Sequence, residues 1–351
     1  MSTLAVEQEH GPADSEPANH YVADFSRHGD INEYLAGMIG ERFGEYRRQW
    51  DKAFRLETVT DFPLYLSLET KLDCNYRCAM CVYSNPEALA DQYYSETMPD
   101  ALFGRIIGEA REHGCPSMGF NMMNEPLMDP KIIDRIAEGN RAGVIDSRIN
   151  TNGSLLTRER AEKLVDSGLT RLLASLDAAS KETYEKIRIG GNYEKVIRNI
   201  ERFLDIRERK NRKLPILRVS MVRLDYNEHE NQAFMDYWKD RADLVSMQEY
   251  RPQVNEDEYL ERSVDNEAKK ITNPDFTCTN PFERMAVKGN GDVLPCCAMI
   301  GYRIKLGNLK DGTLHGFWHS DWMKEIRQHM IDRTWDQIPT CNECLRNLVQ
   351  S

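Results

Sequence analysis

The sequence has no long hydrophobic run. No apolar stretch in its 351 residues approaches the roughly 18 residues that a membrane-spanning helix needs. Residues 1–20 also lack the basic and apolar regions of a secretory signal. We therefore expect a cytoplasmic protein with no membrane partner.

Basic residues are in the minority, 46 against 57 acidic ones, and the net charge is −11. A chain of this charge has no general basic surface to neutralise phosphates, so we expect no nucleic-acid partner. The eight histidines show no ligand spacing. No histidine metal site is predicted on that ground.

Cysteine, by contrast, is plentiful and clustered. Nine cysteines, an odd number, gather mainly in two groups, which in a reducing compartment indicates metal ligation rather than disulfides. Cys115 stands alone after Gly114, where a predicted helix ends. We expect it to be a small buried residue.

The first group is a C-x-x-x-C-x-x-C loop formed by Cys74, Cys78 and Cys81, directly after an alternating apolar run. Three thiolates can bind three irons of an iron–sulfur cube that normally has four protein ligands. One iron then stays open, as in catalytic metal sites. The alternatives are zinc with a remote fourth ligand, or buried thiols that merely lie close; zinc motifs usually pair C-x-x-C units.

Around this loop, residues 62–251 alternate between predicted strands and helices. Six such units predict an α/β fold whose parallel sheet curls into part of a barrel, with the functional groups at the carboxyl ends of its strands. The predicted strands are 64–69, 117–123, 145–150, 170–176, 215–223 and 243–250, and the predicted helices are 100–113, 131–142, 158–167, 181–187 with 193–211, and 229–240.

The flanking segments differ from this core. Residues 1–20 have no periodicity and are predicted to be a disordered leader, and 21–61 to be a helical extension containing one amphipathic helix over 31–54. Residues 252–275 are charged, with prolines at both ends, and are predicted to be a linker or lid. Residues 276–351 are predicted to form a second, small domain.

The cysteine loop and several later motifs resemble the radical S-adenosylmethionine (SAM) enzymes, in which the amino and carboxylate groups of SAM chelate the open iron. MMNEPLMDP resembles the family's G-G-E-P motif, although Met123 and Asn124 replace the glycines. NTNGSLLT and LLASLDAASKETYEKIRIGG resemble two further motifs. The residues that would bind the cofactor by this resemblance are Met80, Glu125, Asn152, Ser175, Asp177 and Arg188.

The resemblance implies specific roles. Glu125 would accept hydrogen bonds from the ammonium of SAM, Arg188 would pair with its carboxylate, and Met80 would lie against its adenine. Each residue also has an ordinary structural explanation. Taken singly, Glu125 could be a solvated loop carboxylate, Arg188 a surface residue and Met80 part of the core. The implied fold is a partial (β/α)6 barrel.

The second cysteine group lies in the tail, where Cys278, Cys296, Cys341 and Cys344 offer four thiolates, and residues 288–292 form a predicted hairpin turn. The spacing resembles the shortened "twitch" form of the SPASM domain, with one auxiliary 4Fe–4S cluster. A zinc ribbon is the alternative. The adjacent Cys297 could be an alternative ligand, a hydrogen-atom donor or a bystander, and its position beside Cys296 favours the bystander.

The resemblance thus implies an oxidoreductase with two 4Fe–4S clusters and SAM, which forms a 5′-deoxyadenosyl radical and oxidises a sugar- or aminocyclitol-like small molecule. The expected metal ligands are Cys74, Cys78, Cys81, Cys278, Cys296, Cys341 and Cys344. A low-potential electron donor such as flavodoxin or ferredoxin is the expected protein partner. The alternatives are a peptide-modifying enzyme, an epimerase, and a non-catalytic zinc scaffold.

Overall fold

The computed structural model describes residues 21–84, 97–250, 277–298 and 300–346. The predicted leader (1–20) and the predicted linker (252–275) lie outside the described residues. Among the described residues, no helix is both long and apolar enough to cross a membrane.

Six neighbouring parallel strands form the centre of the described chain, in the order in which they occur in the sequence. They are β2 (Tyr65–Leu68), β3 (Ser117–Gly119), β4 (Asp146–Thr151), β5 (Arg171–Ser175), β6 (Ile216–Arg223) and β7 (Leu244–Glu249). The predicted α/β fold with a partial six-unit barrel is confirmed. The parallel pairing places the carboxyl ends of all six strands at one edge.

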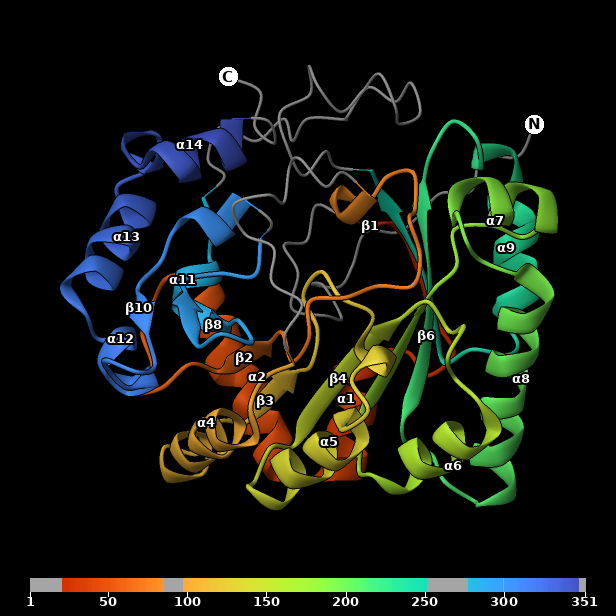
Figure 1. Ribbon diagram of the computed structural model, residues 1–351, viewed down its shortest axis with the longest axis horizontal. Coiled ribbons are helices and arrows are strands. Elements are labelled where there is room, and N and C mark those ends of the chain that lie inside the picture. The colour runs from red at the N-terminus through yellow and green to blue at the C-terminus, as the bar shows by residue number, and fades with distance from the viewer. Residues whose placement is uncertain (1–20, 85–96, 251–276, 299, 347–351) are drawn as a thin grey trace.

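Helices connect these strands and cover their outer face (Figure 1). They are α4 (Asp100–Glu112), α5 (Ile132–Arg141), α6 (Arg158–Asp166), α7 (Lys181–Ile187), α8 (Tyr193–Arg209) and α9 (Asn231–Trp238). Thr157, Ser180 and Asn192 begin three of them, each accepting a hydrogen bond from a backbone N–H of the first turn. Short polar residues therefore decide where these helices start.

The N-terminal extension differs from its prediction in two ways. It begins with a strand, β1 (Tyr21–Ser26), which pairs antiparallel with β7. The helix predicted over 31–54 is two helices, α1 (Ile31–Ile39) and α2 (Glu41–Phe54). Gly40 separates them because its φ of 98° is a conformation that glycine adopts readily and that no helix continues.

The two N-terminal helices close the amino end of the barrel. Phe43 and Trp50 of α2 are buried with Leu64 and Tyr65 at the start of β2. The same cluster contains Ile326 of the tail. The extension thus covers the end of the sheet opposite the cysteine loop and also contacts the tail.

The tail extends the barrel sheet. β8 (Arg284–Val287) pairs parallel with β2, and β9 (Asp292–Leu294) and β10 (Gly307–Asn308) follow it in antiparallel order. The predicted hairpin turn at 288–292 is therefore present. The helices of the tail are α11 (Asn280–Glu283), α12 (Leu314–Trp318), α13 (Asp321–Ile331) and α14 (Pro339–Arg346), drawn in blue in Figure 1.

The hydrophobic core runs across the boundary between barrel and tail. Val287 and Trp318 of the tail belong to the same buried cluster as Leu66 and Phe103 of the barrel. The sequence predicts a second, small domain from residue 276 onward, and the structure joins this segment to the barrel through a shared sheet and a shared core. The reason is β8, whose four consecutive buried residues pair directly with β2.

Candidate functional site

The first cysteine group lies in the loop that follows β2, at the carboxyl edge of the sheet. Its backbone is tied to two neighbouring loops. The N–H groups of Arg77 and Ala79 donate to the carbonyls of Ile189 and Ile187, at 2.9 and 3.0 Å. The N–H of Glu125 donates to the carbonyl of Asp73 at 2.8 Å. The structure thus brings the loops carrying Arg188 and Glu125 against the cysteines.

The three thiols are largely shielded from water. Cys78 is buried, and Cys74 and Cys81 are partly buried. Burial, together with the charges of neighbouring thiolates, raises the pKa of Cys74 to about 12 and that of Cys81 to about 11. Metal ligation must therefore displace protons from these sulfurs, and the bound metal compensates for the buried charge.

Arg188, at the end of α7, joins this group. Its Nη2 lies 2.5 Å from Oδ2 of the fully buried Asp177, and its Nη1 lies 3.6 Å from Sγ of Cys78. Asp177 is itself held by the N–H of Val222 at 2.8 Å. The buried Nε of Arg188 has no hydrogen-bond partner among the described residues. This guanidinium keeps one donor available beside a cysteine ligand.

Glu125 is buried at the end of the β3 loop, and its carboxylate organises the neighbouring turn. Oε1 accepts from the Thr151 hydroxyl at 2.7 Å and from the Leu127 N–H at 3.1 Å, and Oε2 accepts from the Asn152 N–H at 2.7 Å. A carboxylate offers about four acceptor positions. One position remains for a ligand.

Asn152 connects the β4 loop to the cysteine loop. Its amide donates to Oδ1 of Asn75 at 3.0 Å, while its own Oδ1 accepts from the backbone N–H and the hydroxyl of Ser154. Gly153, with φ of 73°, turns the chain where an added Cβ would lie 3.1 Å from Val196. The side chain of Asn152 is thus engaged with protein groups. The sequence did not single out Asn75, although it directly follows Cys74.

The remaining two predicted cofactor residues lie at the same edge. Ser175 is the last residue of β5, partly buried and paired with Ser220 of β6. Met80 packs against a small buried cluster that contains Ile187 and Leu224. All six predicted residues are therefore located around the carboxyl ends of β2 to β6.

In the tail, four cysteines face one another from three segments. Cys278 precedes α11, Cys296 follows β9, and Cys341 and Cys344 lie one turn apart on α14. Burial raises the pKa of both Cys278 and Cys341 to about 12. The charge of the Cys344 thiolate also raises the pKa of Cys278, and the charges of Cys278 and Cys344 raise the pKa of Cys296. These effects indicate that the sulfurs are close together.

The spacing of the sulfurs discriminates between metals. Four thiolates around one zinc ion at about 2.3 Å stand about 3.8 Å apart. Within the described part of the chain, the only three ligand atoms that all lie within 4.8 Å of one another belong to Asp61, His113 and His315. Among the described cysteines, no three sulfurs all lie within that distance of one another. That spacing suits an iron–sulfur cube, in which each thiolate binds a different iron.

Cys297 has contacts on the side of the first cysteine loop. It packs, with Cys74 and Cys81, against a small cluster that includes Tyr83 and Tyr302. Its sulfur lies 3.9 Å from Nη1 of Arg284. Cys297 is therefore located on the side of the tail that faces the first cysteine loop.

Comparison with protein families matches residues 69–235 to the radical SAM superfamily, and residues 278–345 to the SPASM iron–sulfur cluster-binding domain. The chain carries a radical SAM domain followed by a SPASM domain. Both matched ranges include their cysteine group. The radical SAM match covers the strands β3 to β6 and their loops.

Curated relatives match about half of the chain. A probable GTP 3′,8-cyclase of Methanococcus maripaludis is 30% identical over 182 residues, 51% of this chain and 56% of that protein. The GTP 3′,8-cyclase of Desulforamulus reducens is 28% identical over 170 residues, 48% of this chain and 50% of that protein. The chain thus spans about half the length of these relatives.

Solved structures share the fold over more of the chain. BtrN in complex with AdoMet and 2-DOIA aligns with a TM-score of 0.52 and 16% identity, over 80% of this chain and 92% of that one. Streptococcus suis SuiB bound to precursor peptide SuiA aligns with a TM-score of 0.61 and 17% identity, over 81% of this chain and 71% of that one. Identities this low show a common fold alone.

The cofactors that belong to these two matched domains are two 4Fe–4S clusters and SAM. The residues fit them. Three thiolates leave one iron open in the first cluster, four thiolates complete the second, and the partnerless Nε of Arg188 and the remaining acceptor position of Glu125 suit a carboxylate and an ammonium.

Proposed function

We propose that this radical SAM enzyme oxidises a carbinol of a small polar substrate of the sugar or aminocyclitol kind. Among enzymes of the subgroup, the single tail cluster and the spacing of its four cysteines resemble those of 2-deoxy-scyllo-inosamine dehydrogenase. When bound, the first cluster and SAM supply a 5′-deoxyadenosyl radical, which removes a hydrogen atom from substrate carbon. The chain holds and orients these groups and excludes water from them.

The first cysteine loop and its neighbours would do the holding. Cys74, Cys78 and Cys81 would bind the cluster, Arg188 would direct the SAM carboxylate, and Glu125 would receive its ammonium. Asn152 acts by positioning, because its side chain already joins Asn75 to the Glu125 turn. Met80 would offer a polarisable surface to the adenine.

The complete set of four tail cysteines is the observation that carries the proposed oxidation. After hydrogen-atom removal, an alcohol must still lose one proton and one electron to become a ketone. Cys278, Cys296, Cys341 and Cys344 together provide every protein ligand that a cube requires. An electron acceptor held in this way has no open iron for substrate, so electron transfer is the role that its ligation favours.

Epimerisation is the second candidate, and the position of Cys297 favours it. An epimerase must return a hydrogen atom to the substrate radical, and a thiol can donate one. Cys297 shares its packing cluster with Cys74 and Cys81. The names of the curated relatives add nucleotide cyclisation as a third candidate, supported by similarity over about half of each chain.

Incubation with SAM, dithionite and one candidate at a time (2-deoxy-scyllo-inosamine, related aminocyclitols, and GTP) tests the proposal by mass spectrometry. We expect 5′-deoxyadenosine together with an aminocyclitol product two hydrogens lighter, also in Cys297→Ser. Epimerisation would instead give a product of unchanged mass in H2O that gains one deuterium in D2O. This product would not form in Cys297→Ser. A cyclised nucleotide formed from GTP would establish the cyclase. Replacing dithionite by reduced flavodoxin tests the proposed protein donor.

A further inference from the structure

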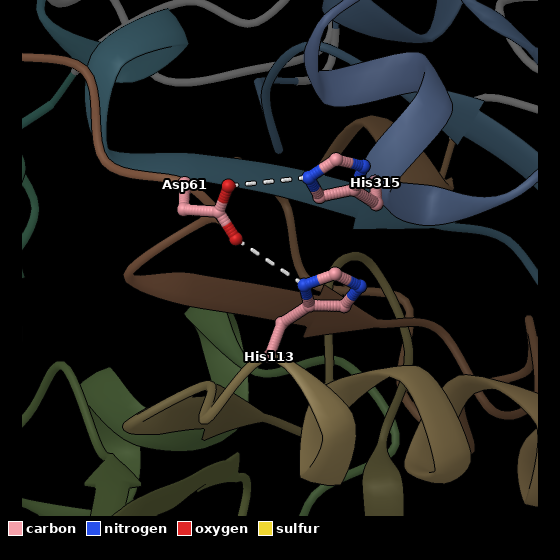
Figure 2. A group of neighbouring side chains, drawn as sticks. All are labelled: Asp61, His113 and His315. Carbon is pink, nitrogen blue, oxygen red and sulfur yellow. Dashed lines mark hydrogen bonds and ion pairs between the residues drawn. The ribbon is translucent and has the colours of Figure 1, made fainter.

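We propose that Asp61, His113 and His315 form a binding site for a divalent transition-metal ion such as zinc, separate from both cysteine sites. Asp61 lies in the segment before β2, His113 directly follows α4, and His315 is in α12 of the tail. Figure 2 shows the two imidazoles directed at the two oxygens of the Asp61 carboxylate. Imidazole and carboxylate are the ligand types that zinc and its neighbours accept.

The separations fit ligands around one ion. Nδ1 of His113 lies 3.3 Å from Oδ2 of Asp61, and Nε2 of His315 lies 3.3 Å from Oδ1. Charge-assisted N–H···O hydrogen bonds are shorter, about 2.7–2.9 Å. Two ligands at about 2.0–2.1 Å from a tetrahedral zinc ion stand about 3.3–3.4 Å apart. Both observed distances match that separation.

A second carboxylate raises the negative charge of the cluster. Glu109 lies in the last turn of α4, four residues before His113, and its Oε2 accepts the backbone N–H of His315 at 3.2 Å. Its other oxygen, Oε1, is a buried atom without a hydrogen-bond partner among the described residues. Asp61 forms ion pairs with both histidines when these are protonated. A bound dication would neutralise both carboxylates.

The histidine rings must turn for the ion to bind. They are stacked with centroids 4.4 Å apart and planes 10° apart, so their lone pairs do not yet converge on one point. His113 is fixed by a second stacking contact with Phe62. The side chain of His315 is 37% exposed and its ring also contacts that of His319, with centroids 4.6 Å apart; the proposal requires it to rotate about its Cβ–Cγ bond toward the shared position.

His319, four residues after His315, holds the backbone of Asp61 in place. Its Nε2 lies 2.8 Å from the backbone carbonyl of Asp61 and holds that segment against the tail. Contacts of this kind orient metal ligands. A metal ion here would connect the barrel, through Asp61 and His113, to α12 of the tail, and would stabilise the folded chain by mass action.

The test uses the full chain with both clusters in place, freed of adventitious metal by EDTA, incubated with zinc sulfate and desalted. We expect about one zinc per chain in addition to the iron. At free zinc about 100 times Kd, Tm should rise by about 4 °C. His315→Ala and Asp61→Asn should lose the zinc and the shift but keep the iron; Asp61→Asn is the gentler change, because that side chain is 75% exposed.

His229→Ala is the matched control, since its side chain is 69% exposed and lies on another part of the barrel. It should bind zinc like the unmodified chain. The proposal is overturned if Asp61→Asn and His315→Ala show the same zinc content and the same Tm shift as the unmodified chain. It is also overturned if none of the three binds zinc. Iron content and SAM cleavage report separately on the proposed function, which does not depend on this site.

Discussion

The guanidinium of Arg188 lies 3.6 Å from the sulfur of Cys78 while it pairs with the buried carboxylate of Asp177 at 2.5 Å. This arrangement sets a positive charge beside the thiol that is the most buried of the three. The charge favours the thiolate and opposes the rise in the pKa of Cys78 that burial causes. Arg188 therefore serves cluster ligation as well as the orientation proposed for SAM.

Arg188→Lys should weaken SAM binding while leaving the first cluster in place. Lysine keeps the charge near Asp177 and Cys78 but lacks the planar set of donors that includes Nε. Loss of one charge-assisted hydrogen bond, about 1.5–3 kcal/mol, corresponds to a roughly 10–100-fold higher Kd. Equilibrium binding of SAM to the reconstituted protein measures this.

The control for this prediction is Arg198→Lys, on the exposed face of α8. It should bind SAM with unchanged Kd. If Arg188→Lys also binds SAM with unchanged Kd at full iron content, Arg188 does not direct the SAM carboxylate.

The seven proposed ligands divide into two independent sets. Reconstituted protein should hold about eight irons, and simultaneous replacement of Cys74, Cys78 and Cys81 by alanine should leave about four. That variant should release no 5′-deoxyadenosine under reduction. Cys341→Ala with Cys344→Ala should keep the first cluster and the cleavage of SAM. Stoichiometric zinc without iron would exclude the enzyme altogether.

The sequence predicts the barrel well because its signals are local. For β6, the run rich in Val, Ile and Leu predicts 215–223, and the structure has 216–223. The caps and glycines that end the helices are also local. β1 is missed because its stability comes from pairing with β7, more than 200 residues away, and YVADFS has too little alternation to predict that pairing.

The site is predicted unevenly for the same reason. Cysteine ligands follow from spacing within one loop or one helix. Asn75, which joins two loops, shows its role only once the strands place residue 152 beside it. His113 and His315 are 202 residues apart in the chain, so no local spacing indicates that both approach Asp61. Their approach to Asp61 depends on packing of the tail against the barrel.

Glu230 should make the stability of the α7 region depend on pH. Its carboxylate accepts from the N–H groups of Ala179 and Ser180 and from the hydroxyls of Ser180 and Thr183. Burial alone would raise its pKa, but these hydrogen bonds outweigh burial and the pKa lies below its ordinary value of 4.5. The charged form is therefore favoured by folding.

Because the folded-state pKa is lowered, this contribution is fully present above about pH 4.5 and is lost as pH falls through the folded-state pKa. Glu230→Gln should reduce the free energy of unfolding by about 2 kcal/mol at pH 7, and the difference should shrink below pH 4.5. Glu228→Gln, with a side chain 62% exposed, is the control and should leave stability unchanged. A pH-independent effect of Glu230→Gln would contradict the assignment.

Cys296 and Cys297 are adjacent in sequence but should differ in their effect on iron. Cys296 lies among the tail ligands, close to Cys278 and Cys344, whereas Cys297 packs near Arg284 on the side of the first cysteine loop. Cys296→Ser should therefore lower the iron content toward about four per chain and Cys297→Ser should keep about eight. Iron analysis with the absorbance of the oxidised clusters measures both, and each variant is the matched control of the other. Loss of the tail cluster in Cys297→Ser alone would make Cys297 the ligand, and would remove the thiol on which the epimerase alternative depends.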